Sequence, residues 1–78
     1  MNELLKKKRL EAGMSALRLA QLSDSQEMRI YNFERGRFLP RPDEALRISG
    51  VLGADPRKLF PGLVERLNEM EGGKNDKR

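Results

Sequence analysis

The sequence predicts an all-α fold, and two observations support that prediction. β-Branched and aromatic residues are sparse: the chain has two valines, two isoleucines, three phenylalanines, one tyrosine and no threonine. No segment alternates apolar and polar side chains over the length of a strand. At 78 residues the chain can bury only one small core, and short helices with local contacts do so most economically.

The chain contains neither cysteine nor histidine. Disulfides, zinc-finger chemistry, a thiol nucleophile and the usual general base are therefore excluded, and we expect no enzyme activity, metal or cofactor. The longest run of strictly apolar side chains is two residues, too short for a membrane-spanning helix or a secretory signal. We therefore expect a soluble cytoplasmic protein.

Capping signals place the first helix. Asn2 is a suitable N-cap for a helix over residues 4–12, and Gly13 supplies its C-terminal stop. Three residues at spacings of four and three share the face expected to point inward: Leu5, Arg9 and Ala12.

Two short helices separated by a tight turn follow. Ser15 is the expected N-cap of a helix over 16–22, and residues 23–25 compete for backbone hydrogen bonds, which indicates a turn. A third helix is expected over 26–34, ending before Gly36. Such a pair in a small basic chain is typical of a DNA-binding helix-turn-helix, although helix hairpins also occur in any small bundle.

Prolines and glycines divide the C-terminal half. A connection over 37–42 leads to a helix that starts at Pro42 and continues to residue 52. Asp55 caps a further turn or two, and residues 63–70 form a last short helix. We therefore expect three parts: a main domain at 1–61, a short C-terminal helix within 62–71 and a flexible tail at 72–78.

The positive charge lies mainly in the N-terminal half. The chain has a net charge of +4 and an isoelectric point near 9.9, which favour an anionic partner such as nucleic acid. Residues 1–40 carry +3, residues 41–60 carry +1 and residues 61–78 carry none. The excess therefore lies in the half that contains the two short helices and their turn.

A set of small, apolar and charged residues recurs at characteristic spacings along the chain. Its members are Leu5, Arg9, Leu10, Ala12, Gly13, Met14, Ser15, Leu19, Ala20, Ile30, Phe33, Glu34, Gly36, Pro40, Leu46, Leu52, Gly53, Leu59 and Phe60. This pattern resembles the helix-turn-helix domain of phage repressors and Cro proteins, the XRE-like family, without a gap over residues 4–60. The resemblance implies a compact five-helix domain that binds double-stranded DNA as a homodimer, with its third helix in the major groove, and regulates transcription, most often as a repressor.

Five outward residues early in the third helix are candidates for base contact: Gln26, Glu27, Met28, Tyr31 and Asn32. The resemblance places Glu27, Met28 and Asn32 at base-contacting positions. Asn32 can bridge two atoms of adenine, Glu27 can accept from the cytosine amine, and Met28 can pack on a thymine methyl group. Alternatively, Glu27 completes a capping box with Asp24, three residues before it.

Four residues are candidates for phosphate contact. Arg35 and Arg37 flank the glycine after the third helix, and Arg41 can join them in a clamp on one strand. Ser15 caps the second helix, whose free N–H groups favour an anion, and capping alone explains this serine equally well. The lysine run at residues 6–8 is more often a solvated helix face than a phosphate contact.

A buried ion pair is expected between the first and third helices. The guanidinium of Arg9 on the inward face requires an acceptor, and Glu34 at the end of the third helix can supply one. The resemblance supports this structural pairing, and the alternative is two independent surface charges.

The chain also departs from the family pattern. Ala16 stands where the family usually has a phosphate-holding Gln, and Asp24 stands where Gly is usual. The aspartate leads us to expect an adjusted turn or a third helix that begins a residue earlier. Several apolar side chains are expected to be partly exposed: Leu17, Leu22, Met28, Phe38 and Leu39.

These departures leave a second function open. A protein-interaction or antitoxin-like module could keep the fold, dock a protein partner and bind DNA weakly or not at all. The substitutions Asn32→Ala and Arg37→Ala discriminate the two functions, because both should weaken an operator complex and leave a protein complex unaffected.

Overall fold

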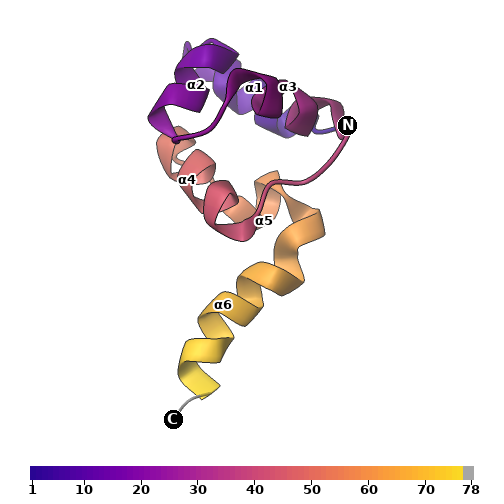
Figure 1. The fold of residues 1–78 in the computed structure, drawn as a ribbon, viewed down its shortest axis with the longest axis vertical. Coiled ribbons are helices and arrows are strands. Elements are labelled where there is room, and N and C mark those ends of the chain that lie inside the picture. Colours follow the sequence, from indigo (N-terminus) through magenta and orange to yellow (C-terminus); the bar gives the residue numbers. More distant parts are fainter. Residues whose placement is uncertain (77–78) are drawn as a thin grey trace.

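The computed structural model describes the backbone of residues 1–76 and the side chains of residues 1–70. The described backbone is all-α and contains no strand, which confirms the fold class. Helices α1 (Glu3–Glu11), α2 (Ala16–Leu22) and α3 (Glu27–Arg35) gather at one end of the molecule. Helices α4 (Pro42–Leu52) and α5 (Pro56–Leu59) lie beside them, and α6 (Val64–Asp76) projects from the other end (Figure 1).

Helix α1 spans Glu3–Glu11, one residue earlier than expected. Its N-cap is Asn2 as predicted, and the Asn2 side chain accepts a hydrogen bond from the Leu5 N–H at 3.0 Å. The prediction that Ala12 shares the inward face was wrong. Ala12 is the C-cap residue, so it lies beyond the last turn of the helix and is exposed.

Helices α2 (Ala16–Leu22) and α3 (Glu27–Arg35) form the helix-turn-helix. Asp24 occupies the left-handed region with φ of 56°, so the turn keeps the conformation that glycine would supply. Helix α3 begins one residue later than expected because Gln26 remains extended, with φ of −126°, and acts as the N-cap. The alternative capping box of Asp24 and Glu27 is also wrong, since Gln26 holds the cap position and no side chain caps this helix.

Prolines begin the helices of the C-terminal half. Helix α4 spans Pro42–Leu52 and α5 spans Pro56–Leu59, with the Asp55 side chain accepting from the Arg57 N–H at 2.9 Å. A 3₁₀ turn, η1 (Pro61–Leu63), leads into α6 (Val64–Asp76). The last helix is therefore longer than the predicted 63–70, because its two glycines do not end it.

The expected tail at residues 72–78 falls partly outside the described residues. Its backbone is helical as far as Asp76, and residues 77–78 lie outside the described part of the chain. The flexibility expected of this segment stays a prediction.

One hydrophobic core joins the six helices of the described backbone. The ring of Phe33 meets that of Phe60 edge to face, with centroids 6.4 Å apart, which links α3 to the segment after α5. Leu67 of α6 is buried in the same core. The buried apolar side chains are Leu5, Ala16, Leu19, Ala20, Ile30, Phe33, Ala45, Ile48, Leu59, Phe60, Leu63 and Leu67.

Candidate nucleic-acid interface

Helix α3 has one buried face and one exposed face. Ile30 and Phe33 are buried in the core. On the other side Glu27 is exposed, Met28 is 64% exposed and Tyr31 is 37% exposed. Asn32 is half-buried, one turn after Met28, and Gln26 is exposed just before the helix begins. The five side chains predicted to contact bases therefore lie on or beside the solvent side of one short helix.

A buried ion pair fixes α3 against α1. Arg9 Nε donates to Glu34 Oε2 at 2.6 Å, and Arg9 Nη2 donates to Glu34 Oε1 at 3.2 Å. Both side chains are less than a tenth exposed. Arg9 also donates to the Met14 carbonyl at 2.9 Å, and its hydrogen bond with Glu34 raises the pKa of Arg9. The structure thus contains the pair expected between these helices, with each charge compensated.

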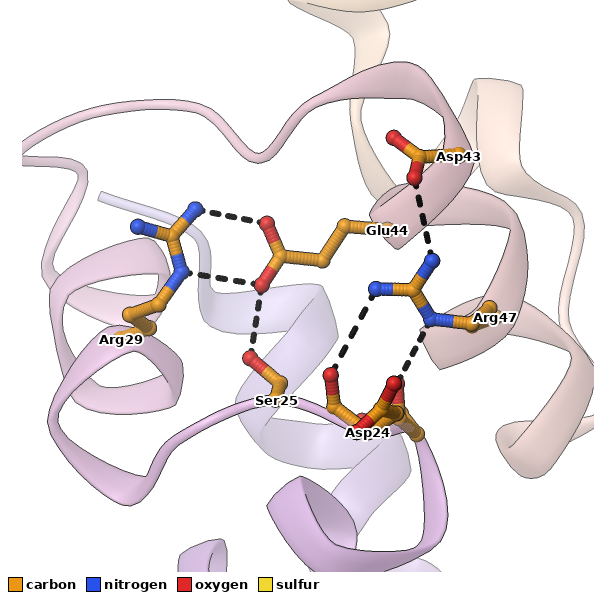
Figure 2. Close-up of polar contacts among 7 residues, drawn as sticks. Asp24, Ser25, Arg29, Asp43, Glu44 and Arg47 are labelled. Carbon is orange, nitrogen blue, oxygen red and sulfur yellow. Dashed lines mark hydrogen bonds and ion pairs between the residues drawn. The ribbon is translucent and has the colours of Figure 1, made fainter.

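Glu44 connects α4 to α3 by hydrogen bonds. Its carboxylate accepts two hydrogen bonds from Arg29, at 2.7 and 3.0 Å, and one from the Ser25 hydroxyl at 2.6 Å (Figure 2). The Glu44 side chain is 3% exposed, whereas that of Arg29 is 35% exposed. The guanidinium of Arg29 also lies over the rings of Phe33 and Phe38, at 5.2 and 5.7 Å from their centroids. These contacts hold one face of α3 and the turn before it against α4.

Arg47, also on α4, binds the backbone of the same turn. Its guanidinium donates to the Ser23 carbonyl at 2.8 Å and to the Asp24 carbonyl at 3.5 Å, and it pairs with Asp43 at 3.1 Å (Figure 2). The carbonyl groups of a turn with a left-handed residue thus have a fixed partner. Glu44, Arg47 and the residues they contact are called the α4 brace. The contacted residues are Ser23, Asp24, Ser25, Arg29 and Asp43.

Two carboxylates of the α4 brace, those of Glu44 and Asp43, have shifted pKa values. Burial alone would raise the pKa of Glu44, but the hydrogen bonds from Arg29 and Ser25 outweigh burial, and the pKa of Glu44 is lowered. The hydrogen bond from Arg47 lowers the pKa of the exposed Asp43. The hydrogen bonds from the arginines therefore favour the charged form of both carboxylates.

The expected phosphate contacts lie at different places around α3. Arg35 and Arg37 are exposed on either side of Gly36, whose φ is 76° and where a Cβ atom would approach the Met1 nitrogen to 2.7 Å. Any side chain at this position would disturb the bend that separates the two arginines. Arg41 instead lines a polar hollow of about 380 Å³ beside the helix-turn-helix turn, together with Arg29 and Arg47.

Ser15 performs its capping role in the structure. Its hydroxyl accepts from the Arg18 N–H at 3.0 Å, and the residue is exposed at the start of α2. Ala16, which stands in place of the family glutamine, is buried in the core and presents no polar group.

Sequence reasoning missed the α4 brace. Arg29 and Glu44 lie fifteen positions apart on different helices, and no local pattern connects them. A partial signal was present, because Asp43 and Arg47 are four residues apart on one helix, a spacing typical of an ion pair.

Other kinds of site are not found in the described part of the chain. Its acidic residues form no group of three or more that could hold a metal ion. No described helix combines the length and the apolar character that crossing a bilayer requires.

The fold and this surface define a helix-turn-helix DNA-binding domain. Two short helices are joined by a fixed turn, and the second presents exposed polar side chains beside exposed arginines. A family model described as helix-turn-helix matches residues 5–59. The chain belongs to this family, the XRE type that resembles Cro and C1 regulators, and it is a DNA-binding helix-turn-helix regulator. Comparison with curated proteins and with solved structures gave no match.

Proposed function

We propose that this protein is a sequence-specific transcriptional regulator, acting as a repressor, that binds its operator as a homodimer in the cytoplasm without a catalytic step. The main support is the arrangement of α3. Its polar face is exposed, while the Arg9–Glu34 pair and the α4 brace fix its orientation from two sides. A helix held in a fixed orientation can insert into the major groove while its base-reading side chains keep their positions.

The base contacts are assigned to the exposed face of α3. Asn32 donates to and accepts from one adenine edge, and Glu27 accepts from a cytosine amine. Met28, whose side chain is exposed, packs against a thymine methyl group. Gln26 and Tyr31 flank these three and reach the neighbouring base pairs.

The phosphate contacts are assigned to the arginines around α3. Arg35 and Arg37 reach the backbone from the bend after α3, and Arg41 reaches it from the start of α4. Ser15 adds a hydroxyl at the start of α2. These contacts supply affinity and register but no sequence information.

A homodimer is proposed on geometric grounds. A domain with one short recognition helix reads only about half of an operator, so a second copy is required for a full site. The two half-sites would then form an inverted repeat.

A binding assay on duplex DNA tests the assignments. Arg37→Ala should weaken binding to all sequences equally and reduce the slope of log K against log salt by about 1. Arg66→Ala is the matched control, because Arg66 is also exposed but lies on α6. Asn32→Ala should lower the affinity for the preferred sequence by about 1–3 kcal/mol and relax specificity. Variants that bind DNA as the wild type does would contradict the assignments.

Exposed apolar side chains favour a second candidate function, a protein-interaction or antitoxin-like module. Leu17, Leu22, Phe38 and Leu39 are each between 44% and 50% exposed. Such side chains could contact a protein partner, although single exposed apolar residues are ordinary. A protein complex that forms normally with Asn32→Ala and Arg37→Ala, in a protein that does not bind duplex DNA, would favour this function.

A further inference from the structure

A groove of about 690 Å³ runs between α1 and α3 on the side of α3 away from the α4 brace's hollow. Lys6 and Lys7 of α1 line one wall, and Tyr31 and Arg35 of α3 line the other. The Arg9–Glu34 pair also belongs to its lining, and its two charges compensate each other.

Three cations of this groove form no ion pair within the described part of the chain. Among the residues that the structure describes, Lys6, Lys7 and Arg35 form no ion pair, and Arg35 only stacks over the Tyr31 ring at 5.8 Å. Two carboxylates, those of Glu3 and Glu11, also line the groove. Apart from the Arg9–Glu34 pair, three cations and two carboxylates line the groove, and this positive balance favours an anion.

The groove is continuous with the proposed DNA-binding face. Tyr31 and Arg35 lie on the exposed side of α3 and also form the α3 wall of the groove. A helix placed in a major groove about 12 Å wide has a phosphate backbone close to each of its flanks. The flank of α3 that faces α1 would thus bring one backbone to Lys6 and Lys7.

We propose that α1 forms part of the DNA interface, with Lys6 and Lys7 holding backbone phosphates of the duplex in the groove shared with Arg35. This proposal rests on the proposed function and adds a second, non-specific contact surface to it. The lysine ammonium groups act as point charges on phosphate oxygens, so they contribute affinity and not base readout.

Single lysine substitutions test the proposal. The variants Lys6→Gln, Lys7→Gln and Lys8→Gln each remove one charge from α1 and leave helix propensity nearly unchanged. Lys8 is the control, because its side chain is half-buried and does not line the groove. Binding to a fluorescent duplex would be measured by anisotropy over a range of salt concentrations, with the preferred sequence and with an unrelated one.

We expect Lys6→Gln and Lys7→Gln each to reduce the slope of log K against log salt by about 0.9, equally for both duplexes, and Lys8→Gln to keep the wild-type slope. Glu11→Gln should strengthen binding, because it removes a carboxylate that would repel the phosphates. If the wild type binds DNA and the variants of Lys6 and Lys7 behave as Lys8→Gln does, the groove proposal is overturned and the proposed function stands. If the wild type itself shows no salt-dependent binding, the proposed function is overturned first.

Discussion

At the scale of single residues, Asp24 adopts a backbone conformation that favours glycine. It is the one non-glycine residue in the described backbone with positive φ, 56°, and no hydrogen bond involves its side chain. A residue without Cβ adopts this conformation at lower cost, even though it gains freedom in the unfolded chain. We expect Asp24→Gly to raise the free energy of unfolding by about 0.5–1 kcal/mol, measured by urea denaturation followed by circular dichroism.

The control for this prediction is Asp24→Ala, which keeps a Cβ atom and should destabilise the domain. If Asp24→Gly were the less stable of the two variants, the strain argument would be wrong and the aspartate side chain would itself support the turn.

The buried ion pair of Arg9 and Glu34 is a second feature at the residue scale on which stability depends. Each charge is buried, so removal of one partner leaves the other uncompensated. We expect Glu34→Leu and Arg9→Met each to lower the free energy of unfolding by about 3 kcal/mol.

The double variant Arg9→Met/Glu34→Leu should recover much of that loss, because no unpaired charge is then buried. Urea denaturation of all four proteins completes a double-mutant cycle. Strictly additive losses would show that the two charges do not depend on each other.

At the scale of elements, the α4 brace fixes α3, and its Glu44 carboxylate makes this contact dependent on pH. The ordinary pKa of a glutamate is about 4.3, and in the folded protein the pKa of Glu44 is lower. Its contribution to stability is therefore present above the ordinary value and is lost as the pH falls through the lowered one.

We expect Glu44→Gln to lower the free energy of unfolding by about 1–2 kcal/mol at pH 7, since it weakens hydrogen bonds to a charged group whose partner is partly exposed. At a pH below the folded pKa the difference should disappear, as measured by urea denaturation at both pH values. Asp43→Asn is the control, because its carboxylate is exposed and contributes little at either pH. A loss from Glu44→Gln that is equal at the two pH values would contradict this account.

The elements also show which features were predictable from the sequence. Local signals were sufficient for Ser15, Pro42 and Asp55, since caps and first-turn prolines act within a few residues. They failed at Gln26, where the turn holds the residue extended. They also failed at α6, where two glycines stay within a helix whose first turns are packed on the core.

Only part of the candidate site was predictable from the sequence. The exposed side of α3 follows from helical periodicity once Ile30 and Phe33 are taken as inward residues. The contact of Arg29 with Glu44 depends on how two helices pack, and a single sequence contains no local signal for that. The groove between α1 and α3 could not be predicted from the sequence either, because it also depends on how two helices pack.

At the scale of the whole molecule, the positive charge is concentrated at one end of the fold (Figure 1). The positive excess of the sequence lies in residues 1–40, and these form α1, α2, α3 and the bend after it. In Figure 1 these helices occupy one end of the molecule, while α6, from the part of the chain with no net charge, projects from the other. One end of the protein is thus suited to the polyanion, and the other remains available for contacts that do not involve DNA.

Selection from a pool of random duplex DNA, followed by sequencing, tests sequence-specific binding through α3. We expect enrichment of an inverted repeat whose half-sites lie about one helical turn, ~10 base pairs, apart. We also expect Asn32→Ala to relax the base preference at one position in each half-site. A selected pool with no common sequence, from a protein that is folded, would contradict the account.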